Sequence, residues 1–92
     1  ESAEVASAAV SIVDNEFQPA EISVSPGTTV TWTNEGSLRH TVTDDGGMFD
    51  SGAVSPGGTF EFTFEEAGTY PYHCTFHGGP GGVGMAAVIT VE

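Results

Sequence analysis

Residues 59–64 read Thr59-Phe60-Glu61-Phe62-Thr63-Phe64 and alternate polar with aromatic side chains without a break. Successive side chains of a strand point to opposite faces of the sheet, so the three phenylalanines would face a core while Glu61 and Thr63 face out. Residues 28–33 have the same period of two, with Val30 and Trp32 on one face and threonines on the other. Both segments predict strands of a sheet with one buried face.

Similar short runs, rich in Val, Ile, Thr and Phe, recur between turn signals along the rest of the chain, and no segment has a helical period. The expected strands are residues 8–13, 21–24, 28–33, 39–43, 59–64, 69–74 and 86–91. Residues 44–56 form a long polar connection, which suits a Greek-key crossover better than a hairpin. We therefore predict an all-β fold, a Greek-key β-sandwich of seven to eight strands. Residues 8–92 would form its single domain, and residues 1–7 an N-terminal tail or the stub of a tether.

Length and charge restrict the classes of function. A chain of 92 residues allows one small domain, which buries roughly 60–65% of the surface that its unfolded form exposes. Thirteen acidic residues stand against the single cation Arg39, and the net charge of −12 argues against binding to nucleic acid or to anionic lipid. The 38% apolar content is too high for a disordered acidic tail, and no apolar run reaches the ~18 residues of a membrane span. A soluble globular domain is expected.

The chain has one cysteine, Cys74, which excludes an internal disulfide and a zinc site built on two or more thiolates. It starts at Glu1, without Met and without a basic and apolar leader. We interpret this as a mature or trimmed domain, so that a signal peptide or lipid anchor would lie outside this sequence.

Four side chains form a candidate metal site: His40, Cys74, His77 and Met85. A thiolate and two imidazoles in a plane, with a weak axial thioether, are the ligands of a one-electron copper site. The strand period places His40 on the core side of residues 39–43, with Arg39 and Thr41 outside. It also turns His73 away from Cys74, as an exposed strand residue, and leaves His77 beyond the end of that strand. The expected cofactor is one copper ion.

The chain resembles the cupredoxin family of blue copper proteins, and in particular its plastocyanin-, halocyanin- and amicyanin-like members. The resemblance rests on Gly68-Thr69-Tyr70-Pro71-Tyr72-His73-Cys74-Thr75-Phe76-His77, on Gly84-Met85 before the last strand, and on residues 30–34 and 40–42. It implies a Greek-key sandwich that binds type 1 copper through His40, Cys74, His77 and Met85 and works outside the cytoplasm.

Two residues depart from the family pattern. Seven residues separate His77 from Met85 where plastocyanin-like loops have four, so the axial ligand could be Met85, the less favoured Met48, water or nothing. Phe76 stands where the family often has Pro and therefore keeps a backbone N–H. We hypothesise that this N–H donates to the Cys74 sulfur.

The favoured function is that of an electron carrier, not an enzyme, which cycles between Cu(I) and Cu(II) and exchanges electrons through the exposed edge of His77. An open copper site for small-molecule redox chemistry is the alternative. Copper storage or delivery, a thiol enzyme using Cys74, and adventitious zinc are less favoured.

The partners would be redox proteins. They would bind at a weakly charged rim around His77, made of Phe76, Pro80, Val83 and Leu38. A membrane tether outside this sequence is possible. Self-repulsion favours a monomer. The acidic excess indicates either a docking patch or a surface adapted to high salt, as in a salt-adapted organism. The patch would lie around Asp44, Asp45 and Asp50, or around Glu65 and Glu66. Arg39 is expected to pair with a surface carboxylate.

Overall fold

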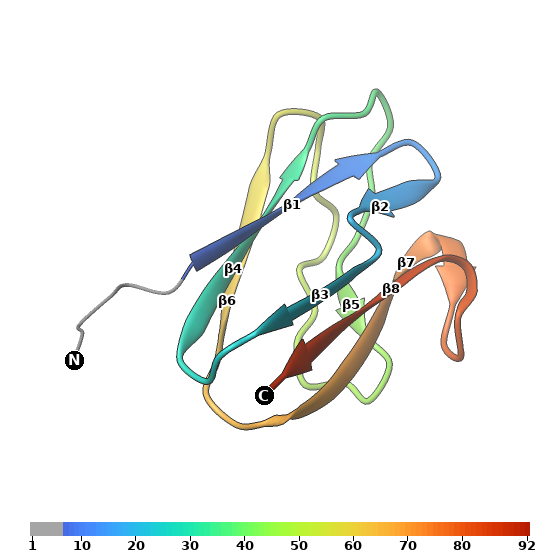
Figure 1. The fold of residues 1–92 in the computed structure, drawn as a ribbon. Coiled ribbons are helices and arrows are strands. Elements are labelled where there is room, and N and C mark those ends of the chain that lie inside the picture. Colours follow the sequence, from blue (N-terminus) through green and yellow to red (C-terminus); the bar gives the residue numbers. More distant parts are fainter. Residues whose placement is uncertain (1–6) are drawn as a thin grey trace.

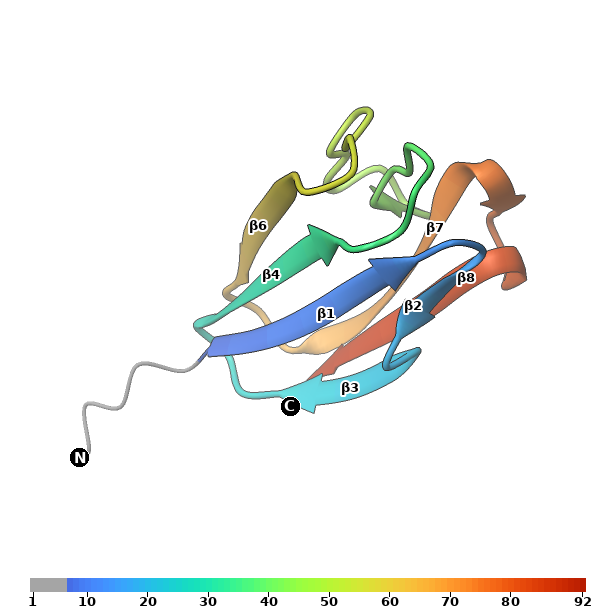
Figure 2. The same cartoon turned by 90° about the horizontal axis from the view of Figure 1, so that it is seen from above.

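The computed structural model describes residues 7–92, which form eight strands and no helix. The strands are β1 (Ser7–Val13), β2 (Glu16–Gln18), β3 (Glu21–Val24), β4 (Thr28–Asn34), β5 (Thr43–Asp44), β6 (Thr59–Phe64), β7 (Gly68–Gly79) and β8 (Val83–Val91). They make two four-stranded sheets, in the orders β2-β1-β4-β6 and β3-β8-β7-β5, that lie face to face as two layers (Figures 1 and 2). The predicted all-β Greek-key sandwich is confirmed. The tail expected at residues 1–7 lies outside the described residues except for Ser7, the first residue of β1.

The core lies between the two sheets and is aromatic. Trp32 of β4 is fully buried and contacts Phe60 and Phe64 of β6 and, edge-on, Tyr72 of β7. The predicted alternation in β4 and β6 is therefore confirmed, although Thr28 is also buried on the inner face of β4. Phe49 belongs to the connection that was interpreted as polar, yet it is buried against Trp32.

Residues 39–43 do not form the regular strand that was predicted. His40 makes an isolated antiparallel bridge with Val54, and regular pairing starts only at β5, where Thr43 lies opposite His73. Thr41 is buried instead of facing out, because its Oγ1 accepts a hydrogen bond from the Thr75 N–H at 2.8 Å. The period of two fails here because no neighbouring strand imposes it.

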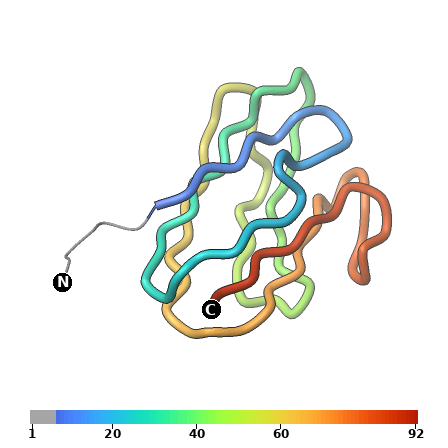
Figure 3. The backbone as a smooth tube through the Cα atoms, viewed as in Figure 1, coloured from blue at the N-terminus to red at the C-terminus, as the bar shows by residue number. Residues whose placement is uncertain are grey.

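The predicted loop after Cys74 is a continuation of two strands. β7 extends to Gly79 and β8 begins at Val83, so His77 lies within β7 and not beyond its end. Gly78 pairs with Gly84, but the register with β8 shifts between His73 and Gly78. Both glycines are needed: a Cβ on Gly78 would lie 2.6 Å from Met85 N, and a Cβ on Gly84 would lie 2.6 Å from His77 O. The hairpin doubles back on itself at one end of the sandwich (orange to red in Figure 3).

Strand β2 was not predicted, because three residues are too few to show a period. Among the described residues, no helix is long and apolar enough to cross a membrane.

Candidate metal centre

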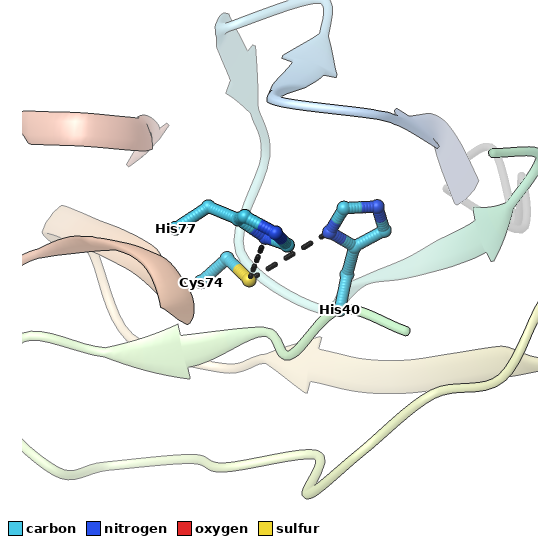
Figure 4. Close-up of side chains that lie close together, drawn as sticks. All are labelled: His40, Cys74 and His77. Carbon is cyan, nitrogen blue, oxygen red and sulfur yellow. Dashed lines mark hydrogen bonds between the residues drawn. The ribbon is translucent and has the colours of Figure 1, made fainter. Parts of the chain in front are cut away.

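His40, Cys74 and His77 bring their donor atoms together, although they come from distant parts of the chain. The Cys74 Sγ lies 3.7 Å from His40 Nδ1 and 3.6 Å from His77 Nδ1, and all three atoms lie within 4.8 Å of one another (Figure 4). β7 supplies Cys74 and His77, and the bridge to Val54 positions His40. The convergence that the sequence predicts for these three residues is present.

The spacing and the donor set fit a single metal ion. An ion bonded to sulfur at about 2.3 Å and to nitrogen at about 2.0 Å, with an angle of roughly 110–120° between the bonds, separates those two atoms by about 3.5–3.8 Å. Both observed sulfur–nitrogen distances fall in this range. One thiolate and two imidazoles suit copper in both of its common oxidation states.

The two histidines differ in their access to solvent. His40 and Cys74 are fully buried, whereas His77 is only half-buried. An exposed aromatic ring lies beside His77: Phe76 is 52% exposed and its ring centroid lies 6.5 Å from that of His77. Leu38 and Val83 are also exposed. The His77 imidazole is thus the donor of the site that faces outward.

The hydrogen bond to the sulfur comes from an unexpected donor. The backbone N–H of Thr41 donates to Cys74 Sγ at 3.4 Å. We hypothesised that the Phe76 N–H donates to this sulfur, and that hypothesis is wrong. Among the described residues, the backbone donor to Cys74 Sγ is Thr41. Thr41 reaches the sulfur because residues 39–43 are irregular and lie against β7.

Of the two methionines, Met85 is buried and Met48 is not. Met85 belongs to the same buried cluster as Cys74, and its backbone N would lie 2.6 Å from a Cβ placed on Gly78, the residue after His77. The chain between His77 and Met85, with its five glycines, therefore closes into a hairpin that brings the Met85 backbone against Gly78. Met48 is half-exposed in the connection after β5.

Asp14 contacts His40, although no pattern in the sequence indicates this contact. Its Oδ1 lies 3.0 Å from His40 Nε2, the ring nitrogen that faces away from Cys74. The same Oδ1 accepts hydrogen bonds from the N–H groups of Ser37 and Leu38, and Asp14 Oδ2 accepts one from the Ser37 hydroxyl. The His40 contact above all, followed by the Ser37 bonds, holds the pKa of Asp14 well below its ordinary value. Asp14 lies in the turn after β1, 26 residues before His40, so no local spacing reveals it.

His73 is buried, which corrects the expectation of an exposed strand residue. It is 6% exposed, and its Nδ1 lies 2.7 Å from Asp45 Oδ1. The other oxygen of Asp45 accepts from the Gly81 N–H at 2.9 Å, at the tip of the β7–β8 hairpin. The carboxylate of Asp45 thus joins β7, the chain after β5 and the hairpin tip.

Two carboxylates of the suggested docking patch accept hydrogen bonds within the protein. Asp44 is buried and accepts from the N–H groups of Gly46 and Met48, and Asp45 is engaged as just described. Glu65 and Glu66 stay exposed.

Arg39 does not pair with a carboxylate among the described residues. Its guanidinium carbon lies 5.9 Å from the centroid of the Phe76 ring. This cation–π contact places the single cation of the chain at the rim of His77.

Asn34 connects the turn after β4 to the chain around His40. Its Nδ2 donates to the carbonyl oxygens of Leu38 at 2.9 Å and of Val54 at 2.8 Å, and its Oδ1 accepts from the Gly36 N–H. Asn34 therefore fixes both the turn before His40 and the bridge partner of His40.

Comparison with known proteins gives one consistent family. The profile of the copper binding proteins of the plastocyanin/azurin family matches residues 4–92. Plastocyanin of Scenedesmus fuscus is 33% identical over 87 residues, covering 83% of this chain and 86% of the relative. Amicyanin of Paracoccus denitrificans is 37% identical over 83 residues, covering 83% of this chain and 63% of the relative.

Solved structures that are similar to this chain include cupredoxins. A purple cupredoxin from Nitrosopumilus maritimus superposes with a TM-score of 0.79 at 31% identity, over 92% of this chain and 99% of the other. The copper-containing nitrite reductase of Thermus scotoductus is also similar, with a TM-score of 0.83 at 25% identity, but only 24% of its chain is matched.

Proposed function

The chain belongs to the plastocyanin/azurin family of copper-binding proteins, and from this premise we propose that it is an electron carrier that holds one copper ion with His40, Cys74 and His77. Copper bound there supplies a one-electron couple between Cu(I) and Cu(II). The convergence of one sulfur and two imidazole nitrogens at metal-ligand spacing carries this proposal. In it, residues 8–92 act as a single copper-binding domain.

In this proposal Met85 would supply the weak, axial thioether ligand. Its support is the closed β7–β8 hairpin, which keeps Met85 buried with Cys74 in spite of the three extra loop residues. A thioether is a weak ligand that tolerates both oxidation states.

Electrons enter and leave through the edge of His77. His40 is fully buried and Cys74 is covered, so His77 is the ligand that a partner can approach. The exposed Phe76 ring beside His77 favours close contact with a redox protein, since removing apolar surface from water is favourable.

The alternative is an open copper site that performs small-molecule redox chemistry, as the similarity to part of a nitrite reductase suggests. The paired glycines of the hairpin and the burial of Met85 support the carrier instead, because a closed hairpin and a buried thioether would leave little room for a small molecule at the metal. Azide added to the Cu(II) protein distinguishes the two: a carrier keeps its spectrum, and an open site changes it.

The experiment that tests the proposal is a titration of the metal-free protein with Cu(II), followed by visible absorption. The carrier develops one intense thiolate-to-copper band at one equivalent, which bleaches reversibly with a mild reductant. Cys74→Ala removes the band. A weak spectrum that is the same in both proteins contradicts the proposal.

The route through His77 has its own test. Phe76→Glu places a negative charge at the rim, so electron exchange with an anionic oxidant slows and exchange with a cationic oxidant accelerates. Ser23→Glu adds the same charge on exposed β3 and is the matched control. Equal rates in the two variants contradict exchange at this rim.

The partners in this proposal are redox proteins, the site of action is outside the cytoplasm, and the chain is a monomer. The net charge of −12 supports long-range attraction of a cationic partner, and it also suits a salt-rich medium. The salt dependence of the rate with a cationic oxidant separates the two roles.

A further inference from the structure

The Asp14 side chain lies on the side of His40 that faces away from Cys74 and is 33% exposed. Four donors face its carboxylate: the Ser37 N–H at 3.1 Å, the Ser37 hydroxyl at 2.8 Å, the Leu38 N–H at 3.2 Å and His40 Nε2 at 3.0 Å. Gly36 also contacts it, since a Cβ on Gly36 would collide with Asp14 Oδ1 and lie 3.0 Å from Asp14 N. Such a set of contacts fixes the position of the carboxylate.

The contact determines where His40 carries its proton. An ionised carboxylate only accepts hydrogen bonds, so the nitrogen facing Asp14, Nε2, is the one that bears hydrogen. In a neutral imidazole the other nitrogen, Nδ1, then has a free lone pair. That atom is the one that lies 3.7 Å from Cys74 Sγ.

We propose that Asp14 is a positioning residue of the copper centre, which holds His40 as its Nε2–H tautomer and so prepares Nδ1 for the metal before any metal binds. The inference rests on the proposed copper site but concerns the metal-free chain as well. Asp14 comes from the turn after β1, in the sheet opposite the one that carries Cys74 and His77. His40 lies in the connection between β4 and β5, so the contact joins this connection to the turn after β1.

The other hydrogen-bond contact of the His40 ring, Cys74 Sγ at 3.7 Å from Nδ1, can donate or accept and so does not by itself select the tautomer. The Asp14 side chain is 33% exposed, so water can take the place of the lost carboxylate; water can donate to Nε2 as well as accept from it and does not select a tautomer. A neutral imidazole with its proton on Nδ1 cannot bind a metal through that atom. Partners of this kind on metal-binding histidines typically contribute about 10–100-fold in metal affinity.

The first test uses metal-free protein and two variants. Asp14→Asn can keep an oxygen at the position of Oδ1 but removes the charge, and Asp14→Ala removes the acceptor. Long-range ¹H–¹⁵N spectra of the histidine rings at pH 8 report the tautomer of His40. We expect the Nε2–H form in the native protein, a mixture or the Nδ1–H form in Asp14→Ala, and an intermediate result in Asp14→Asn. Glu35→Gln, which changes a nearby carboxylate bonded to the Ser11 hydroxyl, leaves the tautomer unchanged.

The second test measures copper. By competition with a chelator, Asp14→Ala should lose about 10–100-fold in Cu(II) affinity, and Asp14→Asn less. The reduction potential of Asp14→Asn should rise, because the negative charge beside His40 favours the more positive ion. Circular dichroism verifies that each variant is folded. If Asp14→Ala does not fold, the comparison is made with Asp14→Asn instead.

An unchanged His40 tautomer in a folded Asp14→Ala variant would overturn the inference, as would native copper affinity in that variant. The tautomer is measured without metal. If the native protein gave no thiolate-to-copper band, the proposed function would fail, while the tautomer result would still stand or fall by itself.

Discussion

His73 Nδ1 lies 2.7 Å from Asp45 Oδ1, one residue before the cysteine of the metal centre. Because Asp45 also accepts from the Gly81 N–H, one carboxylate joins the strand of Cys74 to the tip of the long hairpin. Asp45 is itself held by its N–H, which donates to the Pro71 carbonyl at 2.9 Å. The glycine-rich hairpin is thus anchored at its free end.

Asp45→Ala should loosen the hairpin. It leaves the buried His73 Nδ1–H and the Gly81 N–H without their acceptor, so we expect a loss of about 1–3 kcal/mol in the free energy of unfolding. The Gly81 amide should exchange with solvent faster, and the Cu(II) protein should become sensitive to azide. Denaturant unfolding and amide hydrogen exchange measure these effects.

Asp50→Ala is the matched control. Asp50 lies in the same connection and accepts two hydrogen bonds, from Thr43 and Gly52, but none from the hairpin. Equal Gly81 exchange in the two variants would show that Asp45 does not anchor the tip.

Thr41→Val tests the buried hydroxyl beside the sulfur. The two side chains have nearly the same shape, but valine cannot accept the hydrogen bond from the Thr75 N–H. We expect a loss of about 1–2 kcal/mol in the unfolding free energy of the metal-free protein. Thr31→Val in β4 is the control, since its hydroxyl has no hydrogen-bond partner in the described part of the chain. A loss equal to that of the control would refute the role of the Thr41 hydroxyl.

Regular strands were predictable from the sequence, because paired neighbours impose the period of two. The expected bounds of Glu21–Val24 and Thr59–Phe64 agree with β3 and β6, and Trp32 is buried as its period requires. The meeting of His40, Cys74 and His77 was predictable as well, from residue chemistry and spacing.

Irregular pairing and contacts between distant residues were not predictable. His73 and Thr41 were both assigned to the wrong environment, because pairing is irregular at residues 39–43 and the β7–β8 register shifts after His73. Their burial depends on hydrogen bonds to Asp45 and to Thr75, which no periodic pattern encodes. The same holds for Asp14, whose partner His40 lies 26 residues away in the connection after β4.

Tyr72 should make the stability fall at alkaline pH. Burial in the core raises its pKa from 10.0 to about 12. The folded value is the higher one, so this contribution to stability is complete below pH 10 and is lost as the pH rises towards 12. The loss should reach at most roughly 3 kcal/mol, from two pKa units at about 1.4 kcal/mol each. Denaturant unfolding of the metal-free protein at pH 9 and 11.5 measures it, and Tyr72→Phe should show a smaller decrease. An equal decrease in both proteins would assign the effect to other groups.

Gly36→Ala should displace Asp14 without changing any titratable group. The added Cβ would collide with Asp14 Oδ1, so the carboxylate must move away from His40 or the turn after β4 must shift. Overpacking of this kind typically costs about 1–3 kcal/mol in unfolding free energy. If the carboxylate moves, the His40 ring spectrum of the metal-free variant should resemble that of Asp14→Ala.

Gly79→Ala provides the comparison for that experiment, because a Cβ at Gly79 meets nothing within 4 Å. It should change the unfolding free energy by less than about 0.5 kcal/mol and leave the His40 tautomer as it is. Gly36→Ala separates two roles of Asp14. A destabilised variant with the native tautomer would mean that Asp14 only packs the turn, whereas a changed tautomer would mean that the carboxylate orders the ligand itself.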